Sequence, residues 1–300
     1  MAFLIQARNS MPRRILELFS GLGGWHFALA GRGEIAAAFD ISPSANATYE
    51  LNHGLKPVAV ELASLPFERL VEHCADTWLM SPPCQPFCRM GNHHGLKDPR
   101  SRAFLHLLEC FDHHPPKALV LENVEGFQGS DAHERLTHLL CRQGFDRIER
   151  LLCPSALGIP NQRPRFYLVA SRDPLRHPPL PTAAPRAITA YLDKSEDTKL
   201  YLAEAVLAKH KPGLDLVHAD SHRTACFIGG YGRRFVGSGS FLVTERGIRR
   251  FSPTEVARLL GLPESFHFPE GLPLEKRYKL LGNGLSIPVA RWVLGHLANP

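Results

Sequence analysis

Short apolar segments shape the first part of the chain, and each ends in residues suited to bind a ligand. They span residues 14–20, 35–39, 77–80 and 117–121, and stretches of helical pattern separate them. Strands that alternate with helices form a mostly parallel sheet, and the carboxyl ends of its strands meet at one edge. The sequence therefore predicts an α/β fold with a doubly wound, mostly parallel sheet and a ligand site at that edge.

A glycine-rich turn follows the first segment. Residues 21–24 read Gly-Leu-Gly-Gly, and a helical run covers residues 25–30. Such a turn can bind a nucleotide, because glycine lets the backbone approach a ligand and the helix N-terminus offers unpaired donors. The third glycine of the dinucleotide fingerprint would fall at His26. The pattern therefore disfavours a nicotinamide cofactor and leaves other adenosyl ligands open.

Carboxylates mark two further segment ends. Asp40 lies about 20 residues past the glycine turn, where an acidic side chain can accept from both ribose hydroxyls. The alternative role for Asp40 is a cap on the helix that begins near Ser42. Ile41 could cover one face of an adenine. Residues 58–61 are predicted to form another strand, which ends at Glu61.

A cysteine follows the third segment in a stiff loop. Residues 80–87 read Met-Ser-Pro-Pro-Cys-Gln-Pro-Phe, and Pro82 and Pro83 end the strand because they lack a backbone donor. The prolines hold Cys84 in place, as a positioned nucleophile requires. A buried cysteine in a proline turn is the alternative. The polar residues 89–102 are predicted to be a loop that closes over a substrate, or else a solvated surface.

A carboxyl and two arginines complete the candidate catalytic residues. Glu122 ends the fourth segment, so it should share the sheet edge with Cys84 and Asp40. Arg163 and Arg165 are two positions apart and are predicted to share one face of a strand. Pro164 between them predicts an edge strand or a strand start.

The residue composition of the chain changes after residue 172. Residues 173–185 contain five prolines, which is typical of a linker. Residues 224–244 are rich in glycine and aromatics and are predicted to be β-like; with Arg233 and Arg234 they could stack on and neutralise a nucleic acid, or form ordinary hairpins. We therefore predict a catalytic domain of residues 13–172 with 275–300, and a small target-recognition domain of residues 173–274.

Charge and cysteine usage narrow the function classes. The formal net charge of +6 is compatible with a polyanionic partner. The seven cysteines are scattered without zinc-ligand spacing, and the chain shows neither a secretory signal nor an apolar run of membrane-spanning length. We expect a monomeric, cytoplasmic protein that binds neither a metal nor a membrane.

Taken in order, these motifs resemble those of the cytosine-5 methyltransferases. The matching stretches are residues 19–24, 82–87, 122–124, 163–165, 250–266 and Gly282-Asn283. The closest resemblance is to the tRNA-aspartate methyltransferases that are grouped with DNA methyltransferase homologues. It is carried by Cys226-Phe227 with Tyr231-Gly232 and by residues 158–161. That family has threonine after Cys-Phe, whereas this chain has Ile228.

The resemblance implies S-adenosylmethionine as cofactor and tRNA as partner, with two alternatives: a DNA cytosine-5 methyltransferase and a silent nucleic-acid-binding scaffold. Cys84, rather than Cys88, would attack carbon 6 of cytosine. Glu122 would donate at nitrogen 3, and Arg163 would neutralise the carbonyl oxygen with support from Arg165. The cofactor residues would be Phe19, Gly21, Gly23, Gly24, Asp40, Ile41, Glu61, Pro83 and Asn283. The substrate-binding residues would be Asn161, Cys226, Phe227, Tyr231, Arg233 and Arg234.

Overall fold

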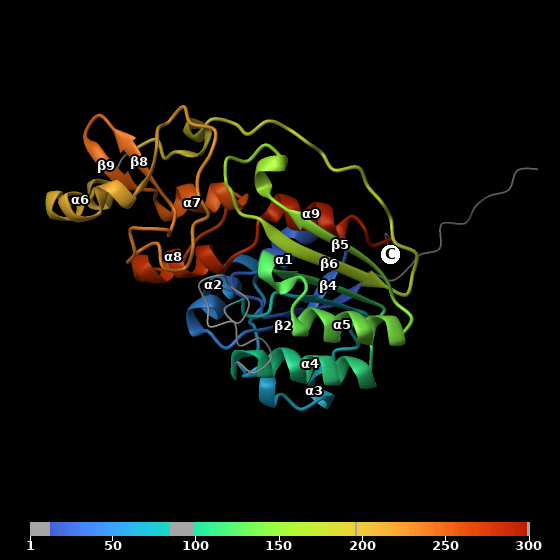
Figure 1. The fold of residues 1–300 in the computed structure, drawn as a ribbon. Helices are drawn as coiled ribbons and strands as arrows, with labels where there is room; N and C mark the ends of the chain where they lie inside the picture. Colours follow the sequence, from blue (N-terminus) through green and yellow to red (C-terminus); the bar gives the residue numbers. More distant parts are fainter. Residues whose placement is uncertain (1–12, 85–98, 196, 299–300) are drawn as a thin grey trace, which may run out of the picture.

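The computed structural model describes residues 13–84, 99–195 and 197–298, and it contains the predicted mostly parallel sheet (Figure 1). Six strands lie in the order β2-β1-β3-β4-β6-β5. β1, β2, β3 and β4 are parallel, whereas β6 is antiparallel to both of its neighbours. The predicted fold class is confirmed. The strands are β1 (Arg14–Leu18), β2 (Glu34–Phe39), β3 (Thr77–Met80), β4 (Ala118–Asn123), β5 (Asp146–Leu152) and β6 (Arg165–Ser171).

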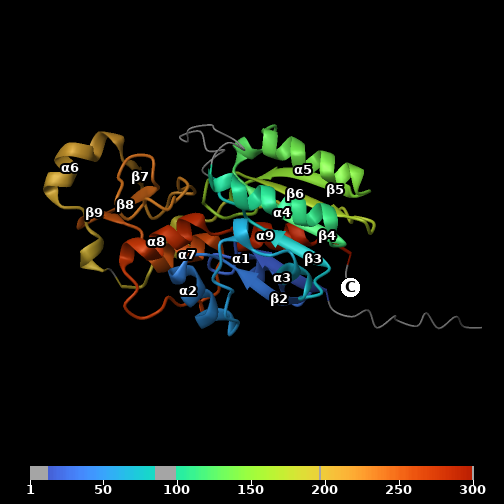
Figure 2. The ribbon, with the colours of Figure 1, turned by 90° about the horizontal axis from the view of Figure 1, so that it is seen from below.

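Helices cover both faces of this sheet (Figures 1 and 2). Ile15 packs in the apolar cluster that contains α1, α2 and α9, whereas its neighbour Leu16 packs with α3, α4 and α5. Successive side chains of a strand point to opposite faces, so a sheet buried on both sides needs the continuous apolar runs seen in the sequence. The helices are α1 (Gly24–Leu29), α2 (Pro43–His53), α3 (Glu68–Val71), α4 (Arg102–His113), α5 (Asp131–Arg142) and α9 (Ile287–Leu294).

The predicted strand at residues 58–61 is wrong. Val58 makes one isolated parallel bridge to Phe39, and the chain then turns. Glu61 caps a short 3-10 helix (Leu62–Ser64), because its side chain accepts from the Ala63 backbone N–H at 3.4 Å. The carboxylate predicted at a strand end therefore sits at a helix start.

A second, three-stranded sheet lies at one end of the molecule (Figures 1 and 2). Its strands are β7 (Asp215–Val217), β8 (Ser240–Thr244) and β9 (Gly247–Arg250), and α6 (Glu204–His210) lies beside it. α7 (Pro253–Leu260) and α8 (Leu274–Asn283) lie between the two sheets. Within the predicted β-like region 224–244 only β8 is a strand; residues 224–239 form turns and irregular structure. No helix in the described ranges has the length and apolar character needed to cross a membrane.

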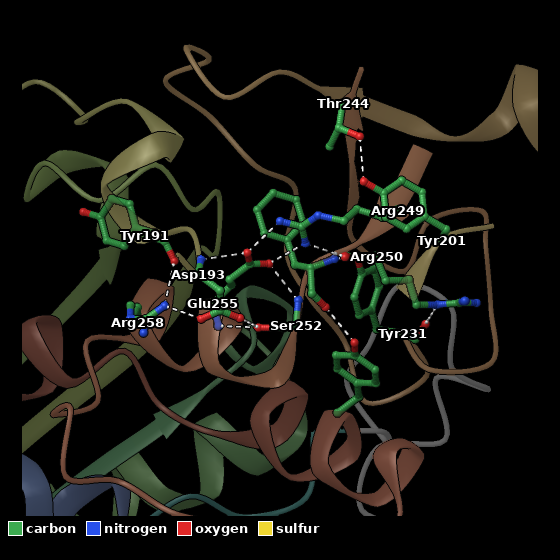
Figure 3. Close-up of polar contacts among 12 residues, drawn as sticks. Tyr191, Asp193, Tyr201, Tyr231, Thr244, Arg249, Arg250, Ser252, Glu255 and Arg258 are labelled. Carbon is green, nitrogen blue, oxygen red and sulfur yellow. Dashed lines mark hydrogen bonds and ion pairs between the residues drawn. The ribbon is translucent and has the colours of Figure 1, made fainter. Parts of the chain in front are cut away.

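A buried ion pair joins β9 to α7 (Figure 3). The Arg249 guanidinium donates to both carboxylate oxygens of Glu255 at 2.7 and 2.8 Å, and these side chains are 4% and 0% exposed. Glu255 also forms a capping box with Ser252 and accepts from the Asp193 backbone N–H at 3.0 Å. The two charges are therefore removed from water but paired with each other, and Glu255 also connects them to Asp193, 62 residues away.

Glu17 places a carboxyl inside the main sheet. It lies on β1, is 0% exposed, and accepts from the Trp25 backbone N–H at 3.1 Å and from the Tyr49 hydroxyl at 2.8 Å. Burial raises the pKa of Glu17 to about 8, although these hydrogen bonds act in the opposite direction. The carboxyl is therefore neutral at pH 7. Its two hydrogen-bond partners, the Trp25 N–H and the Tyr49 hydroxyl, are also neutral groups.

Replacing Glu17 by glutamine should weaken the pH dependence of stability. The pKa of this carboxyl is about 8 in the folded protein against an ordinary 4.5, so the folded state holds a proton that the unfolded state loses. The resulting loss of unfolding free energy should approach ~1.4 kcal/mol per pH unit between these values. The stabilisation that the buried Glu17 carboxyl provides is thus fully present below about pH 4.5 and is lost as the pH rises through about 8. Urea unfolding should show a steeper decline for the wild type than for Glu17→Gln, and equal slopes would contradict this.

Glu255→Ala should strongly destabilise the protein, because it leaves the Arg249 charge buried without its carboxylate. Breaking one partner of such a pair costs about 3–5 kcal/mol. Urea unfolding measures the loss. Glu270 is exposed and offers a matched control, for which Glu270→Ala should change stability by no more than ~0.5 kcal/mol. A similar small change for Glu255→Ala would show that the ion pair contributes nothing.

Candidate active site

One cavity of about 780 Å³ lies at the carboxyl ends of β1 to β4. Its size suits a cofactor together with a reacting group, since small-molecule sites usually measure ~300–1,000 Å³. The residues predicted from separate segment ends thus come together in space. Those that line the cavity are Phe19, Gly21, Gly24, Asp40, Ile41, Glu61, Pro83, Cys84, Glu122, Arg163, Arg165 and Asn283.

The glycine turn and Asp40 form one end of the cavity. The carboxylate of Asp40 accepts from the backbone N–H of Gly21 at 2.9 Å and from that of Ser42 at 2.8 Å. Burial raises the pKa of Asp40, and these two N–H groups oppose the rise. Ser42, not Asp40, caps α2, because its hydroxyl accepts from the Ala45 N–H. Asp40 is therefore a preorganised carboxyl on the cavity wall.

The other predicted cofactor residues divide into lining and supporting positions. Ile41 lines the cavity and is 61% exposed, so its side chain is accessible to a ligand there. Gly23 does not line the cavity. It has φ +88, and a Cβ there would collide with the His53 imidazole, so its role is to permit the turn and the approach of α2. A Cβ at Gly24 would lie 3.0 Å from side-chain atoms of Leu285, so glycine allows this close packing.

Cys84 and Glu122 lie at the opposite end. Arg165 Nε is 3.3 Å from Glu122 Oε1, and Ser81 lines the same cavity. Burial raises the pKa of Glu122, whereas the charges of Arg165 and Arg163 pull it down. Cys84 is partly exposed and lies near enough to Arg165 to influence it electrostatically. A thiol, a carboxyl and a guanidinium thus share one space.

The two arginines have different environments. Arg163 precedes β6, which begins at Arg165, so the prediction that they share a strand face is wrong, while the predicted strand start after Pro164 is confirmed. Arg163 is 3% exposed and donates to the carbonyl oxygens of Gly282 and Gly284 at 3.0 and 2.7 Å. The guanidinium beside Glu122 is that of Arg165, not that of Arg163. Both guanidinium groups line the cavity, and their roles toward a substrate stay predictions.

Several predicted substrate residues belong to the core instead. Phe227 and Tyr231 are 3% and 0% exposed, and the Tyr231 hydroxyl donates to the Ser240 carbonyl at 2.6 Å. Asn161 is 1% exposed and does not line the cavity. Burial alone would raise the pKa of Cys226, but Arg163 and Arg165 outweigh it, and the pKa is lowered. These four side chains support the site from behind rather than face the cavity.

Arg233 and Arg234 remain at the surface. Both are exposed, and Arg233 Nε lies 3.5 Å from Glu275 Oε2 on α8. The predicted loop of residues 89–102 is largely outside the described residues, as is Cys88; Arg102 begins α4 and lines the cavity. In the described part of the chain, no group of His, Cys, Asp and Glu could hold a metal ion.

Sequence reasoning missed other cavity residues. Lys276 and Lys279 line it together with Asn283, at a spacing of three and four that puts them on one face of α8. Glu17 was detectable as the single acidic residue within an apolar strand segment. Ser81 stands between β3 and the prolines, where nothing in its local sequence distinguishes it from a linker residue.

Comparisons with known proteins agree with this geometry. The family model for C-5 cytosine-specific DNA methylase matches residues 13–231 and 216–299. The tRNA (cytosine(38)-C(5))-methyltransferase of Schizosaccharomyces pombe is 34% identical over 96% of this chain and 97% of its own. The human protein of the same name is 29% identical over 93% and 97%. The crystal structure of S. pombe Dnmt2 methyltransferase superposes with a TM-score of 0.85 at 32% identity, over 95% of this chain and 98% of its own. The chain therefore belongs to the C-5 cytosine-specific DNA methylase family and is a cytosine-5 methyltransferase.

Proposed function

We propose that this enzyme methylates carbon 5 of a cytosine in tRNA, in the anticodon-loop region of a tRNA-aspartate-like substrate, through a covalent cysteine adduct. The observation that supports the chemistry is the convergence of Cys84, Glu122 and Arg165 on the cavity that also holds the glycine turn. The names of its relatives support tRNA as the substrate, since the S. pombe and human proteins are tRNA (cytosine(38)-C(5))-methyltransferases. Cys74, Cys110, Cys141, Cys153 and Cys226 form no disulfide, which suits the cytoplasm, where we place the enzyme.

S-adenosylmethionine is the cofactor expected for this family and fold, and the cavity residues fit it. Gly21 has φ +56 and leaves open space where a side chain would lie, so the backbone can approach a ligand. The Asp40 carboxylate, fixed by two N–H groups, suits ribose hydroxyls, and exposed Ile41 suits an adenine face. Glu61, Pro83 and Asn283 complete that wall. When bound, this cofactor supplies an electrophilic methyl group.

In the proposed mechanism Cys84 supplies the nucleophile. Its thiolate attacks carbon 6 of the cytosine, and the electron pair of the 5,6 double bond moves into the ring toward nitrogen 3. Carbon 5 becomes nucleophilic and takes the methyl group. A base such as water then takes the proton from carbon 5, the 5,6 double bond re-forms and the thiolate leaves carbon 6. The proton on nitrogen 3 returns to Glu122, which restores the ring. A positive charge beside a cysteine favours its thiolate form, and Arg165 supplies such a charge near Cys84.

Glu122 would control the charge that builds on the ring. Burial raises the pKa of Glu122, which favours the protonated carboxyl that can donate to nitrogen 3. Arg165, 3.3 Å from this carboxyl, stabilises the carboxylate that remains and can reach the neighbouring ring oxygen. Arg163 would hold the surrounding chain segments in place, because its terminal nitrogens donate to Cys226 and to backbone carbonyls.

A loop base suits this cavity better than a base in a duplex. The target must leave its stack to reach Cys84, and this costs less where bases are already partly unstacked. The second sheet has only three short strands, which offers little surface for reading a DNA groove. Lys276 and Lys279 on the cavity wall provide cations for the RNA backbone, as do the exposed Arg233 and Arg234, of which Arg233 contacts Glu275 on the same helix α8.

Cys84→Ala should abolish a trapped enzyme–RNA adduct. A 5-fluorocytosine in the substrate blocks removal of the final proton, so the covalent intermediate should accumulate and appear as a shifted band under denaturing conditions. Cys88→Ala and Cys226→Ala should retain most of the adduct. Loss of the adduct in Cys88→Ala alone would assign the covalent bond to the other cysteine.

The wild-type enzyme should methylate folded tRNA in preference to an unmethylated DNA duplex at matched concentration. Arg233→Ala with Arg234→Ala should weaken tRNA binding and reduce the slope of affinity against salt by about one to two ion equivalents. Cofactor binding, measured by calorimetry, serves as the control and should stay unchanged. Efficient transfer to the duplex with none to tRNA would instead make the protein a DNA methyltransferase.

A further inference from the structure

Aromatic rings beside the second sheet form a stack that runs from the core to the surface. The Phe235 ring lies 6.4 Å from that of Phe241 on β8, and the His210 imidazole, at the end of α6, stacks on Phe235 at 4.9 Å between centroids. Phe241 is 0% exposed, whereas Phe235 and His210 are partly exposed. His210 therefore forms the outer end of the stack, where a further flat ring can be added.

The stack is fixed before any ligand arrives. The Arg234 N–H donates to the Gly230 carbonyl at 2.8 Å, which closes the turn that leads to Phe235. A Cβ at Gly213, shortly after α6, would lie 2.8 Å from Val236, so the chain after α6 packs tightly on the loop that carries Phe235. Stacking on such a preformed ring costs little ordering entropy.

An unpaired cation lies against the same ring. The guanidinium carbon of Arg250, on β9, is 4.7 Å from the Phe235 centroid, and its Nε donates to the Tyr231 carbonyl at 3.2 Å (Figure 3). The adjacent Arg249 is paired with Glu255, whereas Arg250 forms no ion pair among the residues whose structure is described. A guanidinium that stacks on a ring and has no carboxylate beside it is suited to bind a phosphate.

Further cations flank the stack in sequence. Lys209 and Lys211 lie on either side of His210, and Arg234 directly precedes Phe235; all three cations are exposed. Aromatic rings interleaved with cations are typical of surfaces that bind single-stranded nucleic acid, because bases stack on the rings while the cations neutralise the backbone.

The stack is connected to the cavity through α8. A Cβ at Gly232 would lie 3.2 Å from the Glu275 Cα, so the turn before Phe235 packs on this helix. Lys276 follows Glu275 and lines the cavity. A strand whose target base enters the cavity would therefore bring its neighbouring nucleotides within reach of the stack.

We propose that this surface, formed by Lys209, His210, Lys211, Arg234, Phe235 and Arg250, binds unpaired nucleotides next to the target cytosine. One base stacks on His210, and Arg250 and the lysines bind the adjoining phosphates. This rests on the proposed function, and it explains how a loop is distinguished from a duplex. Bases in a duplex are already stacked on their neighbours, whereas unpaired bases can be splayed out onto an aromatic side chain.

The test measures binding of a labelled RNA stem–loop with an unpaired loop, and of a fully paired RNA of matched length, without cofactor. His210→Leu removes the ring and should weaken stem–loop binding about tenfold, while binding of the paired RNA stays unchanged. His210→Phe restores a ring and should recover most of the loss. In methyl transfer to tRNA, His210→Leu should raise KM by a similar factor with little change in kcat.

Matched controls come from the amino end of β4, at the sheet edge opposite the cavity. His114 follows α4, and its ring lies 4.6 Å from that of Phe67, so His114→Leu removes a comparable contact and should leave both RNAs bound as in the wild type. Lys209→Ala with Lys211→Ala should reduce the slope of log affinity against log salt by about one to two. Lys117→Ala, directly before β4, should leave that slope unchanged.

The outcomes separate this surface from the proposed function. Equal stem–loop binding by the wild type and His210→Leu, with transfer to tRNA intact, would overturn the surface and leave the proposed function standing. A loss that His210→Phe fails to restore would also contradict stacking. Transfer to duplex DNA alone would overturn the proposed function, and the surface with it.

Discussion

The buried guanidinium of Arg163 joins the chain segments that enclose the cavity. Its terminal nitrogens donate to Cys226 Sγ and to the carbonyl oxygens of Phe227, Gly282 and Gly284, at 2.7–3.2 Å. One cation thus holds the start of β6, the segment between β7 and β8 and the end of α8 at fixed distances. A buried charge is tolerable here because carbonyl dipoles take the place of water. The position of Asn283 on the cavity wall depends on this contact.

Main-chain packing reinforces that junction. A Cβ at residue 282 would collide with the backbone of Ile228 and Gly229, so Gly282 allows two main chains to touch. The Ile228 N–H donates to the Ser238 carbonyl at 3.0 Å. Because the backbone makes these contacts, isoleucine can stand where the tRNA-aspartate family has threonine without changing how the two segments meet. Any effect of Ile228 must come through its partly exposed side chain.

The sequence allowed prediction of those site residues that lie next to a strand end. Asp40 and Cys84 follow parallel strands, Glu122 lies at the end of β4, and the fold itself brings such positions together. The aromatic residues could not be placed this way. The hydroxyl of Tyr231 is bound by Ser240 and by the Phe251 N–H, 9 and 20 residues away, so its burial depends on contacts that no local pattern reveals. The same holds for Ser81, whose hydroxyl accepts from Trp25 in another segment.

Two carboxyls at the cavity show how surroundings assign different tasks to one side chain. Burial raises the pKa of both Glu17 and Glu122, yet Glu17 is bound by the neutral Tyr49 hydroxyl and the Trp25 N–H. Its proton is retained at neutral pH, and it acts as a structural acceptor. Arg165 faces Glu122 at 3.3 Å, so the ionised form is compensated as soon as it appears. Burial alone would make a carboxyl that keeps its proton; burial beside a guanidinium makes one that can hold a proton and also release it to a substrate.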